Sequence, residues 1–457
     1  MSVLWTHKDA ATATNGTSVG AWEINGLSID TRSLKPGDLF VPLKDIRDGH
    51  DFIPMALEKG AGAVMSEHPV ADAPVLLVED ALQALRDLAI AARKRSSAKR
   101  IAVTGSVGKT SVKEMLAHVL RGSGNTHASI KSFNNHWGVP LTLAAMAQDT
   151  EYGVFEMGMN HAGELLDLTA VVRPDIAVIT KIAPAHLAHF KSLADIASAK
   201  AEILTGLGKD GVAILPRDSE FYELFASKSP NVLSFGWHPK ADAQILETTH
   251  TASGSTSVLK LAGRSLTLDL PVVGAHWVEN AACVLLTAHT AGINLSCILS
   301  RLKRIDKIAG RGAVHALDIE NHTINLIDES YNANPESMRA AIAALGLIKG
   351  RKIAVLGDML ELGPDELALH AALVIPLENA HIDKVLCCGA HMKALEQALP
   401  KTMLAGWYEN ADACSKGLKD ILQNGDTIMV KGSNASGMGA LVRSLTADNN
   451  KDKQHVL

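Results

Sequence analysis

The amino-acid sequence predicts an α/β fold with three domains and mostly parallel sheets. Apolar segments with strand character alternate along the chain with longer helical patterns, which is typical of parallel sheets covered by helices. A glycine-rich turn lies between such a strand and such a helix near Gly105. Two polar or glycine-rich seams divide the chain into segments of ordinary domain size.

The first seam is the basic run 93–100, directly before the apolar strand 101–103, and the second is the glycine pair around Arg311. A basic run of this kind is more often a solvated helix end and linker than a phosphate-binding patch. We expect domains at residues 1–98, 99–311 and 312–457.

The composition is that of an ordinary soluble protein with ample core. The 457 residues are 47% hydrophobic and 20% charged, with a net charge of −5, which gives no basic field for nucleic acid. The five cysteines are scattered without a Cys-x-x-Cys pair, which favours a reducing compartment over a disulfide framework. The sequence shows neither a signal peptide nor an apolar run of about 18 residues. We therefore expect a cytoplasmic protein without membrane insertion.

The clearest chemical signal is the run 101–111, in which a strand enters a glycine turn and a helix follows. Backbone N–H groups in such a turn surround phosphate oxygens, and the helix N-terminus adds its positive dipole end. Lys109 is expected to reach the β- and γ-phosphates of ATP, and the Thr110 hydroxyl to bind Mg²⁺. An incidental glycine turn is the alternative, which the position between strand and helix disfavours. The usual spacing is not kept, because Val103 or Thr104 stands where a glycine is expected.

The nucleotide-binding residues predicted from this loop are Thr104, Gly105, Ser106, Val107, Gly108, Lys109, Thr110 and Ser111. The helix that follows is expected to bury one face, made of Val112, Met115, Leu116, Val119 and Leu120.

Three further residues in the same segment carry possible metal chemistry. Glu156 ends an apolar strand, at the edge where α/β sheets bind ligands. His186 lies in a loop after the next strand, and Lys200 lies in a helix among small residues. Taken singly, each has a commoner explanation: a cap or surface charge, a solvated histidine, and a lysine that extends into solvent.

Together these segments resemble the Mur ligase family. Thr-Gly-x-x-Gly-Lys-Thr, Glu156-Met157-Gly158, Ala185-His186-Leu187 and Lys200-x-Glu202-Ile203 follow the order and spacing of that family. The resemblance implies a phosphate-loop ATPase-type central sheet and a Rossmann-like C-terminal domain. It also implies that Thr110, Glu156 and His186 hold two catalytic Mg²⁺ ions, and that Lys200 is carbamylated and helps to position the second ion.

Two more matches extend the resemblance within the central segment. The run 133–142 is similar to the family's Asn-x-x-x-Gly-x-Pro-Leu-Thr segment, which implies that Asn135 neighbours the active site. The run 274–281 is similar to Gly-x-His-x-x-x-Asn-Ala, which implies that His276 and Asn280 contact the nucleotide base.

The third segment is similar to the branch of the family that adds a terminal dipeptide. Its Asp-x-x-Tyr-Asn-Ala-Asn-Pro motif begins at Asp328, and implies nucleotide contacts for Asp328, Tyr331 and Asn332. Arg311 matches the arginine that reaches the γ-phosphate. A Walker B reading of Asp328 is the alternative, disfavoured by more than two hundred residues from Lys109. The polar loop 358–363 after a strand is a further ligand site, with Asp358 and Glu361 as substrate-binding candidates.

The first segment is similar to the family's UDP-binding domain. This resemblance implies that Arg32 and His50 meet pyrophosphate and that Ser28 and Thr31 bond uridine. A polar turn residue is the default for each position.

The implied reaction joins D-alanyl-D-alanine to UDP-N-acetylmuramoyl-tripeptide through an acyl phosphate, with ATP as co-substrate and a monomer as the working unit. Lys109, Glu156, His186, Lys200 and Arg311 are the expected catalytic residues. Three alternatives stay open. The ligase that adds the third amino acid typically carries an Asp-Asn-Pro-Arg tetrad, folylpolyglutamate synthase begins near its phosphate loop, and a phosphate-loop GTPase switch carries Asn-Lys-x-Asp. None of these three features occurs here.

Overall fold

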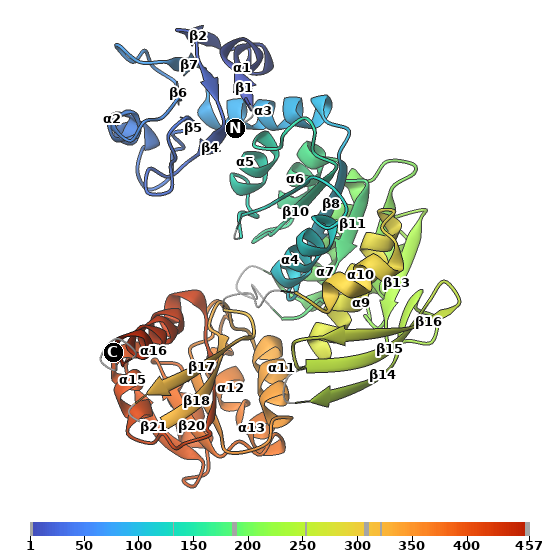
Figure 1. Ribbon diagram of the computed structural model, residues 1–457, viewed down its shortest axis with the longest axis vertical. Helices are drawn as coiled ribbons and strands as arrows, with labels where there is room; N and C mark the ends of the chain where they lie inside the picture. Colours follow the sequence, from blue (N-terminus) through green and yellow to red (C-terminus); the bar gives the residue numbers. More distant parts are fainter. Residues whose placement is uncertain are drawn as a thin grey trace.

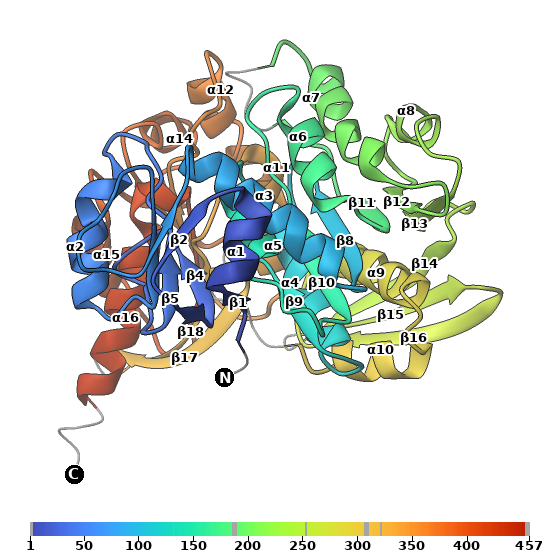
Figure 2. The same cartoon turned by 90° about the horizontal axis from the view of Figure 1, so that it is seen from above.

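The computed structural model describes residues 3–130, 132–184, 190–251, 254–305, 310–319 and 322–452. The chain forms a crescent of three units, each built around its own main sheet (Figure 1). The N-terminal and C-terminal units lie at the two ends and the central unit joins them. Seen from above, the two end units lie on the same side of the central unit (Figure 2). The predicted α/β class with mostly parallel sheets is confirmed.

The N-terminal unit has a five-stranded sheet in the order β2-β7-β6-β5-β4, parallel except for β2, and a two-stranded ribbon of β1 and β3. Its elements are β1 (Trp5–Thr6), α1 (His7–Thr14), β2 (Thr17–Val19), β3 (Glu23–Ile24), β4 (Gly26–Ser28), β5 (Asp38–Phe40), the 3₁₀ turn Gly49–Phe52, α2 (Ile53–Glu58), β6 (Ala63–Ser66), β7 (Val75–Leu77) and α3 (Ala81–Arg95).

The N-terminal and central units share one apolar core. Helix α3 packs against α5 of the central unit, and buried side chains of both units form one cluster. The indole Nε1 of Trp5 donates to the carbonyl of Ala144 at 3.0 Å, and the guanidinium of Arg95 stacks on the Trp5 ring at 3.7 Å. The polar seam before residue 99 therefore marks a change of sheet but not a gap in the core.

The central sheet has nine strands in the order β16-β15-β14-β13-β12-β11-β8-β10-β9. Strands β9 to β14 in this array are parallel, and β15 and β16 extend it as antiparallel strands. Its elements are β8 (Lys99–Thr104), α4 (Lys109–Leu120), β9 (Thr126–Ala128), α5 (Gly138–Ala144), β10 (Tyr152–Glu156), α6 (Glu164–Val172), β11 (Ile176–Ile179), α7 (Leu193–Lys200), the 3₁₀ segment Ala201–Gly206, β12 (Val212–Pro216), α8 (Tyr222–Ala226), β13 (Val232–Gly236), β14 (Ala243–Thr251), β15 (Gly254–Leu261), β16 (Arg264–Leu270), α9 (Ala275–Thr290) and α10 (Leu295–Leu302).

The strand, turn and helix predicted around residue 105 are present. Strand β8 ends at Thr104 and α4 begins at Lys109. The predicted helix face is confirmed, because all five of its apolar side chains are buried: Val112, Met115, Leu116, Val119 and Leu120.

The C-terminal unit has a six-stranded sheet in the order β17-β18-β22-β19-β20-β21, parallel except for the edge strand β17. Its elements are β17 (Ala313–Ile319), β18 (His322–Glu329), α11 (Pro335–Gly346), β19 (Lys352–Gly357), α12 (Glu366–Ala371), α13 (Val374–Asn379), β20 (Lys384–Cys388), α14 (Lys393–Ala398), β21 (Leu404–Tyr408), α15 (Ala411–Lys419), β22 (Thr427–Lys431), the 3₁₀ turn Asn434–Ser436 and α16 (Met438–Asp452). Among the described helices, none is long and apolar enough to cross a membrane.

Candidate active site

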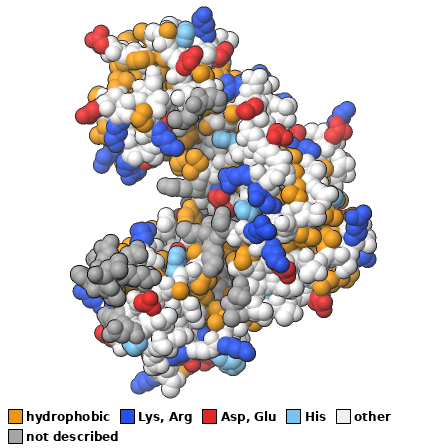
Figure 3. Space-filling model, in the orientation of Figure 1, with side chains coloured by type: hydrophobic (Ala, Val, Ile, Leu, Met, Phe, Trp, Pro, Cys, Tyr) orange, Lys and Arg blue, Asp and Glu red, His pale blue; other side chains and the backbone are white. Residues whose placement is uncertain are grey.

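A cavity of about 300 Å³ lies between the carboxyl edge of the central sheet and the C-terminal unit. The space-filling view shows the molecule hollowed between its two arms, with lysine and arginine side chains gathered on the inner face (Figure 3). Both units supply the lining: Ser106, Val107, Gly108, Lys109, Thr110, Ser111, Ser132, Asn134, Glu156, Lys181, His276, Trp277, Glu279, Asn280, Gly310, Arg311, Glu329, Tyr331, Asn332, Asn334, Glu336, Ser337, Ala340 and Lys431.

The phosphate loop forms one wall of the cavity. Gly108 has φ +88°, and a Cβ there would lie 2.7 Å from Oδ1 of Asn280. Gly105 has φ +152°, and a Cβ there would collide with the hydroxyl of Thr180. Only glycine fits both positions, because the loop is closely packed against α9 and the end of β11.

Two cations reach into this wall. The amine of Lys109 donates to the carbonyl of Gly105 at 2.8 Å, and burial lowers its pKa. Nη2 of Arg311 donates to Oγ1 of Thr110 at 3.0 Å, and the guanidinium lies 4.5 Å from the centre of the Tyr331 ring. The structure thus brings Arg311 into contact with Thr110, next to Lys109 in the loop, although Arg311 lies about two hundred positions further along the chain.

The donor set around Glu156 fits a magnesium ion. Glu156 is 1% exposed; Asn134 donates to its Oε1 at 2.8 Å, whereas Oε2 is buried and has no hydrogen-bond partner among the described residues. An unpaired carboxylate oxygen in the same cavity as the Thr110 hydroxyl is the kind of oxygen ligand that Mg²⁺ prefers. His186 lies outside the described residues.

Lys200 is the last residue of α7 and is buried rather than solvated. Its side chain is 1% exposed and has no hydrogen-bond or ion-pair partner in the described part of the chain. Burial, together with the nearby charge of Lys109, holds its pKa well below the ordinary value of 10.5. A neutral amine is the form that can react with CO₂, so the surroundings suit a carbamate.

Of two adjacent asparagines, the cavity is lined by Asn134 and not by Asn135. The Oδ1 of Asn135 accepts from the backbone N–H groups of Trp137 and Gly138, at 3.2 and 2.9 Å, where α5 begins. Asn134 instead faces Glu156. Within the segment that the motif marks, the structure thus directs the side chain of Asn134, and not that of Asn135, into the cavity.

Helix α9 supplies the wall on which His276 and Asn280 lie. Both line the cavity. Burial, with smaller effects of Lys431 and Lys181, lowers the pKa of His276 to about 4. His276 is therefore neutral at physiological pH and can accept or donate a hydrogen bond without adding charge.

The C-terminal unit closes the cavity with Tyr331 and Asn332. The Tyr331 hydroxyl donates to Oγ of Ser132 at 2.6 Å, and the carbonyl of Asn332 accepts from the amine of Lys431 at 2.9 Å. Asp328 does not line the cavity. Its carboxylate accepts from the amides of Gly310 and Ser330, at 2.8 and 3.1 Å, and holds the turn next to Arg311.

Several cavity residues were not singled out from the sequence: Ser132, Lys181, Glu279, Glu329, Glu336 and Lys431. Lys431 and Glu329 end parallel strands β22 and β18, and Lys181 follows β11 closely. Polar residues at the carboxyl ends of strands were the available signal. The amine of Lys431 lies 3.5 Å from the Glu329 carboxylate, and burial raises the pKa of Glu329 and lowers that of Lys431.

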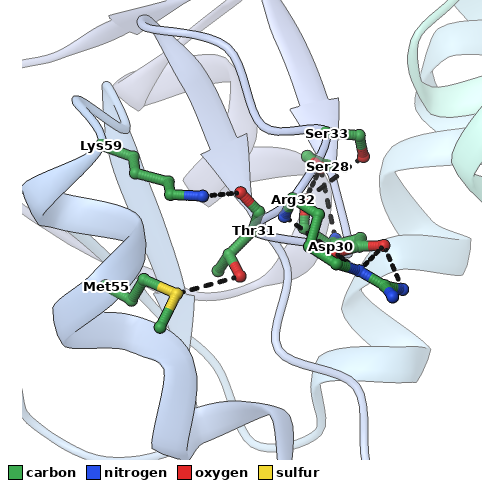
Figure 4. Close-up of polar contacts among 7 residues, drawn as sticks. All are labelled: Ser28, Asp30, Thr31, Arg32, Ser33, Met55 and Lys59. Atoms are coloured by element: carbon green, nitrogen blue, oxygen red, sulfur yellow. Dashed lines mark hydrogen bonds and ion pairs between the residues drawn. The ribbon is translucent and has the colours of Figure 1, made fainter.

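The residues predicted to bind UDP lie in the N-terminal unit, away from this cavity. The loop after β4 is held by its own contacts: the Ser28 hydroxyl donates to the carbonyl of Asp30 at 2.9 Å, and the Thr31 hydroxyl to Sδ of Met55 at 3.3 Å (Figure 4). Arg32 pairs with Asp30, and its side chain is 88% exposed. His50 contacts the Asp48 carboxylate at 2.6 Å and accepts from the amide of Glu67 at 3.2 Å.

Asp358 and Glu361 lie in the loop after β19 and do not line the cavity. Asp358 is buried, accepts from the amide of Met392 at 2.9 Å, and has its carbonyl bonded by the amide of Ser433 at 3.0 Å. Glu361 is exposed, with φ +62°.

A phosphate loop, an unpaired buried carboxylate and an arginine at the junction with the C-terminal unit define a nucleotide-dependent enzyme of the phosphate-loop class. Three family models match the chain: the Mur ligase family, catalytic domain, over residues 23–94, the Mur ligase middle domain over 103–288, and the Mur ligase, glutamate ligase domain over 311–434. The chain belongs to the Mur ligase family.

Relatives and solved structures agree with this assignment. The chain is 33% identical to a UDP-N-acetylmuramoyl-tripeptide–D-alanyl-D-alanine ligase of Rickettsia prowazekii, over 96% of this chain and 99% of that one. It is 35% identical to the ligase of the same name from Escherichia coli, over 94% and 96%. The fold is similar to that of a crystal structure of MurF from Acinetobacter baumannii, with a TM-score of 0.86 and 30% identity over 96% of this chain and 98% of that one. It is also similar to a crystal structure of MurF from Thermotoga maritima in complex with ADP, with a TM-score of 0.81 and 25% identity over 94% of this chain and 98% of that one.

Proposed function

We propose that this chain is the ATP-dependent ligase that joins D-alanyl-D-alanine to UDP-N-acetylmuramoyl-tripeptide. The observation that carries the proposal is a single cavity in which the phosphate loop, Glu156, Arg311 and Tyr331 meet. The named relatives of nearly equal length catalyse this step, according to their names, and one similar structure contains ADP. The product is the UDP-muramoyl-pentapeptide precursor of peptidoglycan.

The reaction needs two steps, because a carboxylate is a poor electrophile. The C-terminal carboxylate of the tripeptide attacks the γ-phosphorus of ATP, and an acyl phosphate and ADP form. The amine of D-alanyl-D-alanine then attacks the acyl carbon, the amide bond forms, and phosphate leaves. Both steps depend on holding the reactants in one cavity, since positioning and electrostatic stabilisation dominate phosphoryl transfer.

The side chains of this cavity have distinct tasks in that scheme. Lys109 stabilises the negative charge on the β- and γ-phosphates. Arg311, which contacts Thr110 at 3.0 Å in the structure, stabilises charge on the transferred phosphoryl group from the opposite wall. His276 and Asn280 hold the nucleotide base.

Magnesium is assigned to Thr110, Glu156 and His186, with Lys200 as a carbamate. The buried, unpaired Oε2 of Glu156 and the lowered pKa of Lys200 support this assignment. Bound there, two Mg²⁺ ions neutralise part of the charge of two anions that have to meet.

The proposed division of labour follows the three segments. Residues 1–98 bind the UDP part of the substrate with Ser28, Thr31, Arg32 and His50. Residues 99–311 bind ATP. Residues 312–457 close over the bound ATP and bind the dipeptide near Asp358 and Glu361. A monomer is the proposed working unit. We place the reaction in the cytoplasm, where ATP is available and where five free cysteines suit the reducing conditions.

The decisive experiment measures phosphate release and product mass with ATP, Mg²⁺, UDP-muramoyl-tripeptide and D-alanyl-D-alanine. Turnover should require all of them, and Lys109→Ala, purified as a folded protein, should release almost no phosphate. Running the meso-diaminopimelate and lysine tripeptides side by side also identifies the third residue. Turnover with a UDP-muramoyl-dipeptide and a free diamino acid, but not with the tripeptide, would assign the chain to the preceding step instead.

A further inference from the structure

Lys181 connects the phosphate loop to the C-terminal unit. It follows strand β11, and its backbone carbonyl accepts from the amide of Ser106 at 2.8 Å and from the amide of Val107 at 3.4 Å. Its side chain runs the other way, across the cavity. The amine of Lys181 lies 2.5 Å from Oε1 of Glu336, which is 155 residues away in the chain.

Glu336 is well placed to receive this cation. It lies in the first turn of α11, whose N-terminus is capped by Asn334 and Ser337. The other carboxylate oxygen of Glu336 accepts from Arg339 at 3.0 Å within the same helix. Burial opposes ionisation, but the contacts with Lys181 and Arg339 outweigh it and lower the pKa of Glu336. The carboxylate is therefore charged and held between one cation of its own helix and one of the central unit.

The pair is one of three described polar contacts that cross the cavity. The contacts of Arg311 with Thr110 and of Tyr331 with Ser132 are the other two, and the first uses residues that the proposed reaction needs near the phosphates. Lys181 is half exposed, at 51%, and Glu336 is 26% exposed. Because both side chains are partly exposed, we place this ion pair at the solvent-facing edge of the cavity, where it can hold the two walls together without occupying the phosphate site.

Resting on the proposed function, we propose that Lys181 and Glu336 are positioning residues for ATP: their ion pair holds α11 against the phosphate loop and sets the cavity in its nucleotide-binding arrangement. Because Lys181 bonds the loop through its backbone and α11 through its side chain, one residue fixes both walls. Preorganisation of this kind lowers the free-energy cost of binding and leaves the chemical step alone.

The test is a double-mutant cycle on KM and kcat, with Lys181→Met, Glu336→Gln and the combined variant. Each single change should raise KM for ATP about two- to fivefold, the usual range for a partly exposed ion pair, with kcat and the KM for UDP-muramoyl-tripeptide unchanged. The combined variant should be no worse than either single one. Lys181→Arg, which keeps the charge, should restore the wild-type KM. Arg339→Met is the matched control, because it touches Glu336 without crossing the cavity, and should leave KM for ATP unchanged.

Additive effects of the two single changes would show that Lys181 acts on the nucleotide directly and would overturn the pairing. A fall in kcat with unchanged KM, or an equal rise of KM for ATP in Arg339→Met, would overturn it as well. Thermal unfolding of each variant excludes a general loss of structure as the cause. Absence of ligation by the wild-type protein would refute the proposed function instead, so the two failures are distinct.

Discussion

Replacing Lys200 by methionine should stabilise the protein while abolishing its activity. The lysine is 1% exposed and has no polar partner among the described residues. A buried donor without a partner costs about 1–3 kcal/mol, and methionine fills a similar volume without a polar head. We therefore expect Lys200→Met to raise the free energy of unfolding by about 1–3 kcal/mol at neutral pH. Urea unfolding in CO₂-depleted buffer measures the difference.

The pH dependence of this difference has a definite sign. Burial and the charge of Lys109 hold the pKa of Lys200 in the folded protein below its ordinary value of 10.5. Between the folded and the unfolded pKa the unfolded chain binds more protons, so the wild-type protein gains stability as the pH rises. The advantage of Lys200→Met is thus full below the folded pKa and shrinks as the pH approaches 10.5.

Lys209→Met, at an exposed position, is the matched control and should change stability by no more than about 0.5 kcal/mol at any pH. In activity assays Lys200→Ala should be nearly inactive, and acetate should restore part of the ligation by supplying the oxygens of the missing carbamate. A methionine variant that is less stable than the wild type would refute the destabilising burial of the Lys200 amine. An alanine variant with full activity and no response to acetate would falsify the carbamate.

Three further outcomes are expected. Arg32→Ala, which removes an exposed guanidinium from the N-terminal unit, should raise KM for UDP-muramoyl-tripeptide more than KM for ATP. Equal increases of the two KM values would contradict the proposal that the N-terminal unit binds the UDP part of the substrate. Asp328→Asn should lower the free energy of unfolding by about 1–3 kcal/mol and lower kcat, because asparagine keeps only one of the two oxygens that accept from the amides of Gly310 and Ser330 beside Arg311; denaturant titration and initial rates check both. Burial lowers the pKa of His276 to about 4, so between about pH 6.5 and pH 4 the unfolded chain binds more protons than the folded protein. The free energy of unfolding should therefore decrease as the pH is lowered through this window, and it should decrease less in His276→Gln, as denaturant titration at several pH values measures.

Local chemistry explains what the sequence determined by itself. The alternation of apolar strands and amphipathic helices predicts parallel α/β units, because each pattern is set by the residue spacing of one element. The phosphate loop follows from the glycines before Lys109, whose backbone conformation only glycine adopts easily. The strand-end position of Glu156 predicted a ligand site for a similar reason, since parallel strands present their carboxyl ends at one edge.

Only the tertiary structure decided which side chains meet. Asn134 and Asn135 are neighbours in sequence, but their side chains point in different directions. Asn134 donates a hydrogen bond to Glu156, whereas Asn135 accepts from the backbone N–H of Gly138 at the start of α5. Local spacing gave no indication of the ion pair between Lys181 and Glu336, because its partners are 155 residues apart and come from two different units.

Burial was equally beyond the reach of the sequence. A lysine in an amphipathic helix is ordinarily solvated, and Lys200 is buried because the elements packed around the end of α7 exclude water from it. The N-terminal unit likewise shares its core with the central unit, although a basic, polar seam separates them in the chain. Exclusion of water depends on surfaces brought together from distant segments, and no local pattern of residues encodes it.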